Sequence, residues 1–104
     1  MTNWSETLPL TRESVARHVG KCGGVLRLFC TTRMGPDVFY VANCEDLCAS
    51  LIALLSGVTC NHQFAHRLRQ PGVGFRFFPS DNADERSQVE EIELAKWRPA
   101  CNAR

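Results

Sequence analysis

The stretch VFYVANCEDLCASL, Val38–Leu51, decides the predicted fold, because it reads as a strand, a tight turn and the start of a helix. Its first four residues are β-branched or aromatic, which favours a short strand covered on both faces. Asn43 is a suitable helix N-cap, and the two acidic residues after Cys44 would stabilise the positive end of a helix. The leucines that follow recur with helical period, so we expect a helix over Cys44–Ser56.

A second strand sequence, Val25–Thr32, precedes this stretch, and the turn-forming cluster Arg33–Asp37 separates the two. Two short strands joined in this way favour an antiparallel hairpin. Further upstream, Thr11 is expected to cap a short helix that ends near Gly20. The polar arm Met1–Pro9 carries a lone tryptophan that we expect to dock on the domain surface.

The second half of the chain predicts one more strand, at Val73–Phe78, and a long helix over Ala83–Trp97 that Ser80 or Asp81 would cap. The expected buried stripe of this helix consists of Val89, Ile92 and Ala95. The element order is therefore (α)ββαβα. It predicts an α+β fold with a small, three-stranded, mainly antiparallel sheet flanked by helices. Residues 1–22 are expected to form an arm and short helix, and residues 23–104 the domain proper.

Length and composition exclude some classes of function. The 104 residues are 44% hydrophobic and 22% charged, with a formal net charge of +1. Near-neutral charge gives no argument for nucleic acid or an anionic membrane, so such binding would need a local patch. No apolar run approaches the ~20 residues that span a bilayer, and the first ten residues do not resemble a signal peptide. We therefore expect a cytoplasmic protein that does not bind membranes and whose cysteines are reduced.

Several short strings occur in a characteristic order: Gly24-Val25-Leu26, Tyr40-Val41-Ala42, Asn43-Cys44-Glu45-Asp46-Leu47, Val89-Glu90-Glu91-Ile92-Glu93-Leu94 and Lys96-Trp97-Arg98-Pro99-Ala100-Cys101-Asn102. In order and spacing they resemble the GIY-YIG nuclease domain over roughly Gly24–Asn102. Members of that family close with a glutamate-bearing helix and a Pro-x-x-Asn turn.

The resemblance implies a metal-dependent phosphodiester cleavage. In the family, a glutamate holds one divalent metal ion, an arginine on the first helix stabilises transition-state charge, and strand tyrosines position or activate water. Carried over to this sequence, the glutamate is Glu90 and the second-motif tyrosine is Tyr40. These two are the predicted catalytic residues, with Glu90 as the ligand of a weakly held Mg²⁺.

The remaining family positions are not retained. The first tyrosine corresponds to Leu26, the motif-closing glycine to Ala42, and the arginine to Ser50, or to Cys48 at the other plausible offset. Losing one such stabilising interaction typically lowers the rate by ~10²–10³. The sequence therefore predicts a nuclease-like fold with an incomplete catalytic set.

Each retained residue also has an ordinary interpretation. Glu90 precedes Leu94 and Trp97 at helical spacing, so it lies at the edge of a buried face, where it is either a metal ligand or a solvated glutamate. Tyr40 lies in an apolar strand, where a tyrosine is commonly a core residue whose hydroxyl is satisfied at the sheet edge.

Cysteines and histidines suggest a possible zinc site. The candidate ligands are Cys44, Cys48, Cys60, His62 and His66. Four such ligands would suit tetrahedral zinc, but their spacing matches no familiar zinc motif, and cysteine often serves as a small buried hydrophobe. We therefore do not expect zinc.

Arginines supply the candidate nucleic-acid contacts, which are Arg27, Arg33, Arg67, Arg69 and Arg76. Interleaved phenylalanines near Arg76 would suit single-stranded nucleic acid. In the alternative, strand alternation places Phe75 and Phe77 in the core and Arg76 on the opposite face.

Three hypotheses follow for the function. The chain is a module that binds nucleic acid or a protein without cleaving it, a weak or altered metal-dependent DNA endonuclease that uses Glu90 and Tyr40, or a zinc-stabilised interaction domain. The missing arginine at Ser50 favours binding over cleavage.

Overall fold

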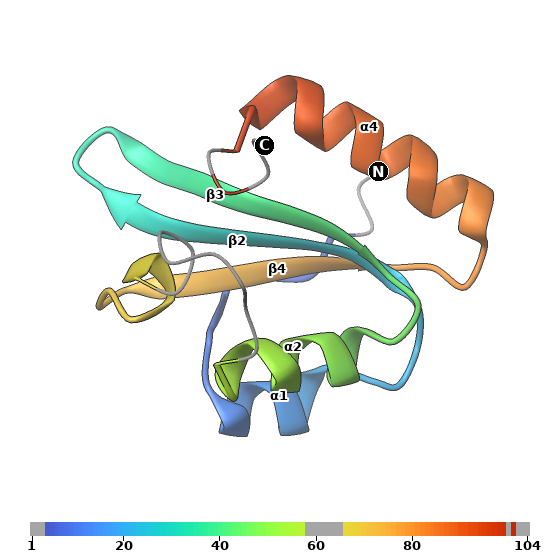
Figure 1. Cartoon of the computed structure of the whole chain (residues 1–104), viewed down its shortest axis with the longest axis horizontal. Coiled ribbons are helices and arrows are strands. Elements are labelled where there is room, and N and C mark those ends of the chain that lie inside the picture. Colours follow the sequence, from blue (N-terminus) through green and yellow to red (C-terminus); the bar gives the residue numbers. More distant parts are fainter. Residues whose placement is uncertain (1–3, 58–65, 100, 102–104) are drawn as a thin grey trace.

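The β-branched and aromatic runs of the sequence form a long hairpin. The computed structural model of the chain describes residues 4–57, 66–99 and 101. In it, β2 (Gly24–Thr32) pairs antiparallel with β3 (Gly35–Cys44), and the hairpin extends beyond the helices at its turn (Figure 1). The predicted hairpin is confirmed, and β3 is longer than expected at both ends.

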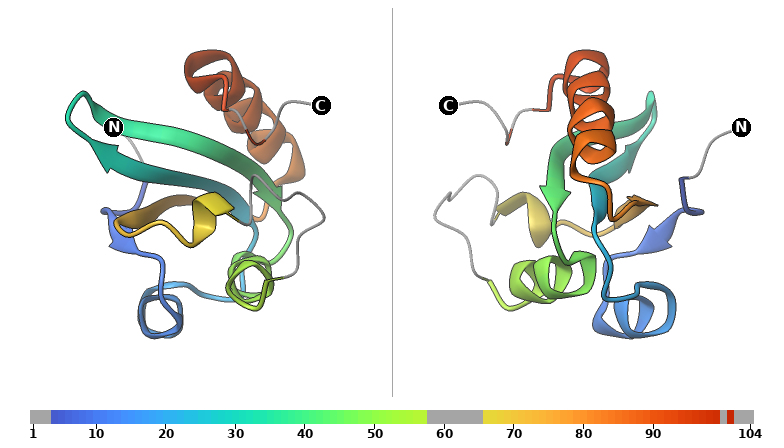
Figure 2. Two further views of the ribbon diagram at one scale, coloured as in Figure 1. Left: turned by 60° about the vertical axis from the view of Figure 1, so that its left-hand side comes forward. Right: turned by 90° about the vertical axis from the view of Figure 1, so that its right-hand side faces the viewer.

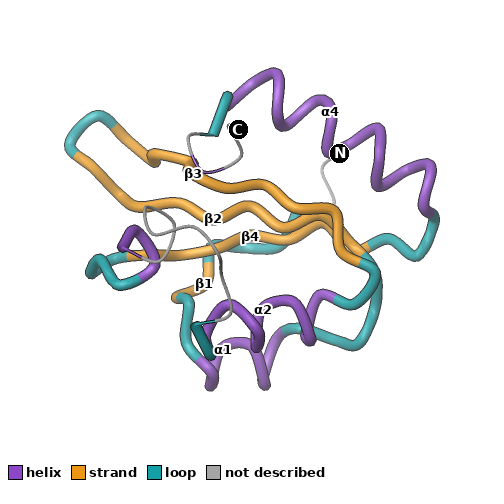
Figure 3. The backbone as a smooth tube through the Cα atoms, viewed as in Figure 1, coloured by secondary structure: helices purple, strands orange, loops and turns teal. Residues whose placement is uncertain are grey.

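Two further strands complete the sheet on the other side of β2. β4 (Val73–Pro79) pairs antiparallel with β2, and the short β1 (Leu8–Pro9) pairs with β4, so the strand order is β1-β4-β2-β3 (Figure 3). The α+β fold with an antiparallel sheet flanked by helices is therefore confirmed. The sheet has four strands rather than three, because the N-terminal arm contributes β1.

Helices cover both faces of this sheet. α1 (Arg12–His18) and α2 (Leu47–Leu55) lie side by side on one face, and α4 (Ala83–Trp97) crosses the other (Figures 1 and 2). Alternate residues of the strands pack toward opposite helix layers. Leu26, Leu28 and Phe75 pack toward α1 and α2, whereas Val25 and Phe29 pack toward α4.

One irregularity in β3 brings two neighbouring aromatic residues to the same layer. Leu28 is opposite Tyr40 but Phe29 is opposite Val38, so Phe39 is an extra residue in β3. Phe39 is fully buried in the core beneath α1 and α2, and Tyr40 packs against that same core. A β-bulge of this kind re-aims side chains near the edge of a sheet.

The helix ends follow capping rules, with two differences from expectation. Thr11 caps α1 as predicted, accepting from the backbone N–H of Ser14 at 3.1 Å. The N-cap of α2 is Asp46 rather than Asn43, because Asn43 still pairs with β2. The N-cap of α4 is Asn82, one residue later than the latest predicted position.

The predicted buried stripe of α4 is wrong at Ile92 and Ala95, which are exposed, whereas Val89 does pack against the core. Ile92 is 65% exposed, whereas Glu93 is 5% exposed and Arg86 is 8% exposed. The helix is rotated so that charged side chains face the sheet, and the partners of these side chains explain this orientation.

Arg27 of β2 is the partner of Glu93. Its Nε donates to Glu93 Oε1 at 2.6 Å, and the indole N–H of Trp97 donates to the same oxygen at 3.2 Å. The expected docking of Trp4 is also observed here. The centroid of the Trp4 ring lies 4.1 Å from the guanidinium carbon of Arg27, and the ring packs edge-on against Phe78.

Candidate functional site

A pocket opens along β3, the edge strand of the sheet, where β3 faces α2. Its volume is ≈ 250 Å³. The residues that line it, called here the β3-edge pocket, are Leu26, Tyr40, Ala42, Asn43, Cys44, Ser50, Ala53 and Leu54. They include four positions that the nuclease resemblance singles out, namely Leu26, Tyr40, Ala42 and Ser50.

Strand register and helical spacing bring these residues together. Leu26 is opposite Ala42 and Leu28 is opposite Tyr40, so alternate residues of β2 and β3 present side chains to the same face. On α2, Ser50 precedes Ala53 and Leu54 by three and four residues, which places all three on one side of the helix. The pocket thus lies where that side of α2 meets the edge of the sheet.

The pKa of the Tyr40 phenol is raised. Burial raises the pKa of its phenol above the ordinary value of 10.0, and the negative charges of Cys44, Glu90 and Cys101 raise the pKa further. Burial also raises the pKa of the Cys44 thiol above 9.0. At neutral pH both groups are therefore protonated, and neither supplies a charge to the pocket.

Glu90 approaches this pocket from the opposite layer. It is half-buried on α4, and its charge raises the pKa of both Tyr40 and Cys44. Tyr40 and Glu90, which the sequence resemblance predicts to be catalytic, therefore lie near the same edge of the sheet. Glu90 does not itself line the pocket.

Among the residues that the structure describes, no cationic side chain lines the β3-edge pocket. Arg86 is close enough for its charge to lower the pKa of Cys44, but it is buried on the α4 side. Its Nε donates to Asn43 Oδ1 at 2.9 Å and its Nη1 donates to the Ser80 carbonyl at 3.1 Å. The sequence reasoning missed Arg86, although its position one helical turn before Glu90 was a signal that could have found it.

The predicted nucleic-acid-binding arginines lie on different sides of the molecule. Arg27 pairs with Glu93 under α4, and Arg76 lies opposite Arg27 on β4. Arg67 pairs with Asp37 and lies 5.0 Å from the ring of Phe39, on the other face of the sheet. The two remaining candidates, Arg33 and Arg69, are exposed. Whether any of the five binds nucleic acid stays a prediction.

The strand alternation expected around Arg76 is observed. Phe75 and Phe77 lie in the core beneath α1 and α2, whereas Phe78 packs toward α4.

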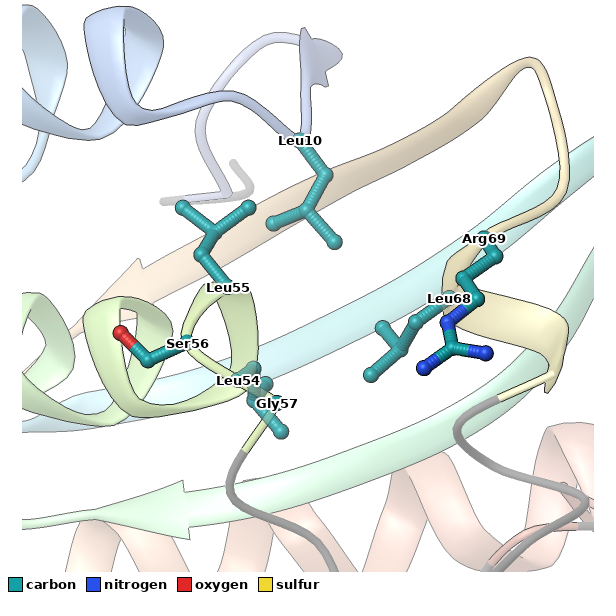
Figure 4. A pocket seen from close by; sticks show the side chains of 7 residues that line it. All are labelled: Leu10, Leu54, Leu55, Ser56, Gly57, Leu68 and Arg69. Atoms are coloured by element: carbon teal, nitrogen blue, oxygen red, sulfur yellow. The ribbon is translucent and has the colours of Figure 1, made fainter.

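A second cavity, of ≈ 340 Å³, lies between the end of α2 and the turn before β4. Leu10 and Leu55 point toward one another across it, and Leu68 and Arg69 approach from the opposite side (Figure 4). It is larger than the β3-edge pocket but contains neither Tyr40 nor Glu90, so the retained family positions give it no role.

The candidate metal ligands of the sequence fall partly outside the described residues. No group of three or more histidine, cysteine, aspartate or glutamate side chains lies together in the part of the chain that the structure describes. Cys60 and His62 lie outside the described residues, while Cys44 and Cys48 both pack into the core beneath α2. Glu90 offers one carboxylate, which fits only a Mg²⁺ ion that keeps several waters.

In the ranges 4–57 and 66–99, no helix is long and apolar enough to cross a membrane. No protein-family model matches the chain, and no curated protein is similar to it in sequence.

Proposed function

We propose that the chain is a nucleic-acid-binding module that holds an unpaired base in the β3-edge pocket and does not cleave the backbone. The observation that carries this proposal is the described lining of the pocket, in which aromatic, amide and hydroxyl groups converge and none of the described residues is a cation. The nuclease-like order of elements supports a nucleic-acid ligand, and the chemistry of the lining supports a base rather than a phosphate.

A nucleobase is flat, uncharged and polar along its edge. Single-stranded nucleic acids are commonly recognised by stacking unpaired bases on aromatic side chains and by hydrogen bonds to their edges. Tyr40 supplies a phenol, Ser50 a hydroxyl and Asn43 an amide, while Ala53 and Leu54 supply apolar surface. A phosphate would instead need a cation, and the nearby charge of Glu90 would repel it.

The same lining argues against cleavage. Phosphodiester cleavage develops negative charge that a metal ion and a guanidinium stabilise. Leu26 and Ser50 replace the tyrosine and arginine of the resembling family, and burial keeps the Tyr40 phenol protonated. Arg86 is already engaged by Asn43 and Ser80 on the far side of β3.

A weak metal-dependent endonuclease is the second candidate, and the proximity of Glu90 to Tyr40 favours it. One carboxylate with bound waters would hold Mg²⁺ at this edge of the sheet. Arg86, one helical turn from Glu90, would then be the cation nearest the reacting phosphate.

The test is fluorescence anisotropy with a labelled single-stranded oligonucleotide and its duplex, followed by denaturing electrophoresis after incubation with Mg²⁺ or Mn²⁺. We expect saturable binding that prefers the single strand and leaves it intact. Failure to bind any single strand would overturn the proposal. Metal-dependent cleavage that is lost in Glu90→Gln would establish the second candidate instead.

A further inference from the structure

Two arginines lie side by side on the face of the sheet that α4 covers. Arg27 of β2 and Arg76 of β4 are direct cross-strand partners. Like charges at directly opposed positions of a sheet are destabilising unless something offsets them.

Only one of the two charges is offset by a carboxylate. Arg27 is paired with Glu93, and its guanidinium carbon lies 4.1 Å from the ring of Trp4 and 5.3 Å from that of Trp97. Arg76 donates from Nε to the backbone carbonyl of Ser5 at 2.8 Å. No carboxylate within residues 4–57 or 66–99 pairs with Arg76, so its charge is available to a ligand.

A small cavity lies at this point. Its volume is ≈ 80 Å³, and its lining consists of Thr7, Arg27, Phe29, Pro36, Val38, Arg76 and Trp97. The residues described in this lining supply two guanidinium groups and a hydroxyl, and none of them carries a carboxylate. Since one water needs about 10–15 Å³ by the same measure, the cavity has room for a group of several heavy atoms.

We propose that this cavity is an oxyanion site that binds a phosphate group through Arg76 and Thr7. Arg27, whose charge is paired with Glu93, forms a fixed wall of the site between the two indoles, and Arg76 supplies the charge and the hydrogen bonds. A guanidinium matches the oxygens of phosphate with two parallel N–H donors, which is the geometry that favours arginine at such sites. The site lies on the face of the sheet opposite to the β3-edge pocket. A test of phosphate binding here is therefore independent of the proposed function.

The phosphate could belong to a nucleic-acid strand or to a small phosphate monoester. The first experiment therefore uses inorganic phosphate alone, titrated at constant ionic strength against chloride and followed by NMR. The resonances to follow are the Arg76 Nε–H and the Trp97 indole N–H. We expect saturable shifts at both, and Arg76→Met should weaken binding by about tenfold or more.

Further variants keep the result interpretable. Arg76→Lys retains a cation and should retain part of the affinity, and Thr7→Val, at an exposed position, removes a hydroxyl from the lining without touching the core. Arg17→Met is the matched control, because Arg17 is an exposed arginine on α1 whose side chain is 71% accessible. It should leave the affinity unchanged.

The two sources are distinguished by competition. A dinucleotide that displaces inorganic phosphate would identify a phosphodiester strand, and displacement by a nucleoside monophosphate alone would identify a monoester. The proposal is overturned if phosphate gives no saturable shift at Arg76 and Trp97. It is also overturned if Arg76→Met and Arg17→Met weaken binding equally, which would indicate non-specific electrostatics.

Discussion

Arg27 on β2 and Glu93 on α4 form a buried ion pair, in which Nη2 of the guanidinium lies 2.5 Å from Oε1 of the carboxylate. The two side chains are only 10% and 6% accessible. Because Trp97 donates to the same oxygen, the pair positions both the middle and the end of α4 on the sheet. This polar contact, together with the packing of Val89, Leu94 and Trp97 against the sheet, fixes the rotation of the helix.

Substituting one partner of this ion pair should destabilise the fold more than substituting both partners. We expect Arg27→Met or Glu93→Leu alone to lower the free energy of unfolding by about 3–5 kcal/mol, because each leaves an uncompensated buried charge. The double variant should cost less than either single one. Urea unfolding of the wild type, the two single variants and the double variant measures these free energies. If the losses of the single variants simply add in the double variant, the two charges are not coupled.

Gly24 should tolerate no side chain. A Cβ there would lie 2.5 Å from the Phe78 carbonyl oxygen and 2.6 Å from Cδ1 of Leu47. Gly24→Ala should therefore lower the free energy of unfolding by about 1–3 kcal/mol. Gly20→Ala is the matched control, because a Cβ at Gly20 meets nothing within 4 Å. Equal stabilities of the two variants would contradict the close packing at the start of β2.

The sequence predicted those features that depend on neighbouring residues. The hairpin and the Thr11 cap both follow from local propensity. The start of α2 was predicted too early in the chain, because Asn43 is a good N-cap residue. In the structure Asn43 remains in β3, where it pairs with Val25.

Features set by distant residues could not be predicted. The predicted stripe of Val89, Ile92 and Ala95 has helical period, yet Ile92 is exposed. Glu93 is buried instead, because its partner Arg27 lies 66 residues earlier in the chain. The convergence of Leu26, Tyr40 and Ser50 could be anticipated only through a family resemblance. Arg86 differs from these features, because its position one helical turn before Glu90 was a usable signal in the sequence.

The proximity of Glu90 to Tyr40 can be read directly from a titration. Tyr40 is the single tyrosine of the chain, so tyrosinate absorbance reports it alone. We expect a pKa above 10.0 in the folded protein, and Glu90→Gln should lower it by removing a nearby negative charge. Glu91→Gln, an exposed neighbour on the same helix, is the control and should change nothing. If both variants titrate like the wild type, Glu90 is not at this site.

The same groups predict a loss of stability in alkali. The folded state keeps the Tyr40 and Cys44 protons that the unfolded chain releases at its ordinary pKa values of 10.0 and 9.0. The free energy of unfolding should therefore be unaffected by these groups below about pH 9 and fall as pH rises further. Cys44→Ala should remove the part of this decline that begins near pH 9. A decline of equal size and onset in Cys44→Ala would exclude Cys44 as its source.

Restoring cleavage should require at least two substitutions. The unaltered protein is expected to nick neither single- nor double-stranded DNA with Mg²⁺ or Mn²⁺. Ser50→Arg with Leu26→Tyr places a cation and a phenol at two positions of the β3-edge pocket, and Glu90→Ala should abolish any activity that this graft creates. Because Leu26 is fully buried, the graft must first be shown to fold. Cleavage by the unaltered protein that is lost in Glu90→Ala would contradict the expectation, and Arg86 would then be the arginine to substitute.

The most direct test of base binding fills the β3-edge pocket without changing its charge. Ala53 lines the pocket on α2, whereas Ala49, one turn earlier on the same helix, is exposed. Single-stranded DNA affinity is therefore measured by anisotropy for Ala53→Leu and for its matched control Ala49→Leu. We predict that Ala53→Leu weakens binding by at least about tenfold, a loss of about 1.4 kcal/mol, while Ala49→Leu binds like the wild type. Equal affinities of the two variants would show that the base does not enter this pocket.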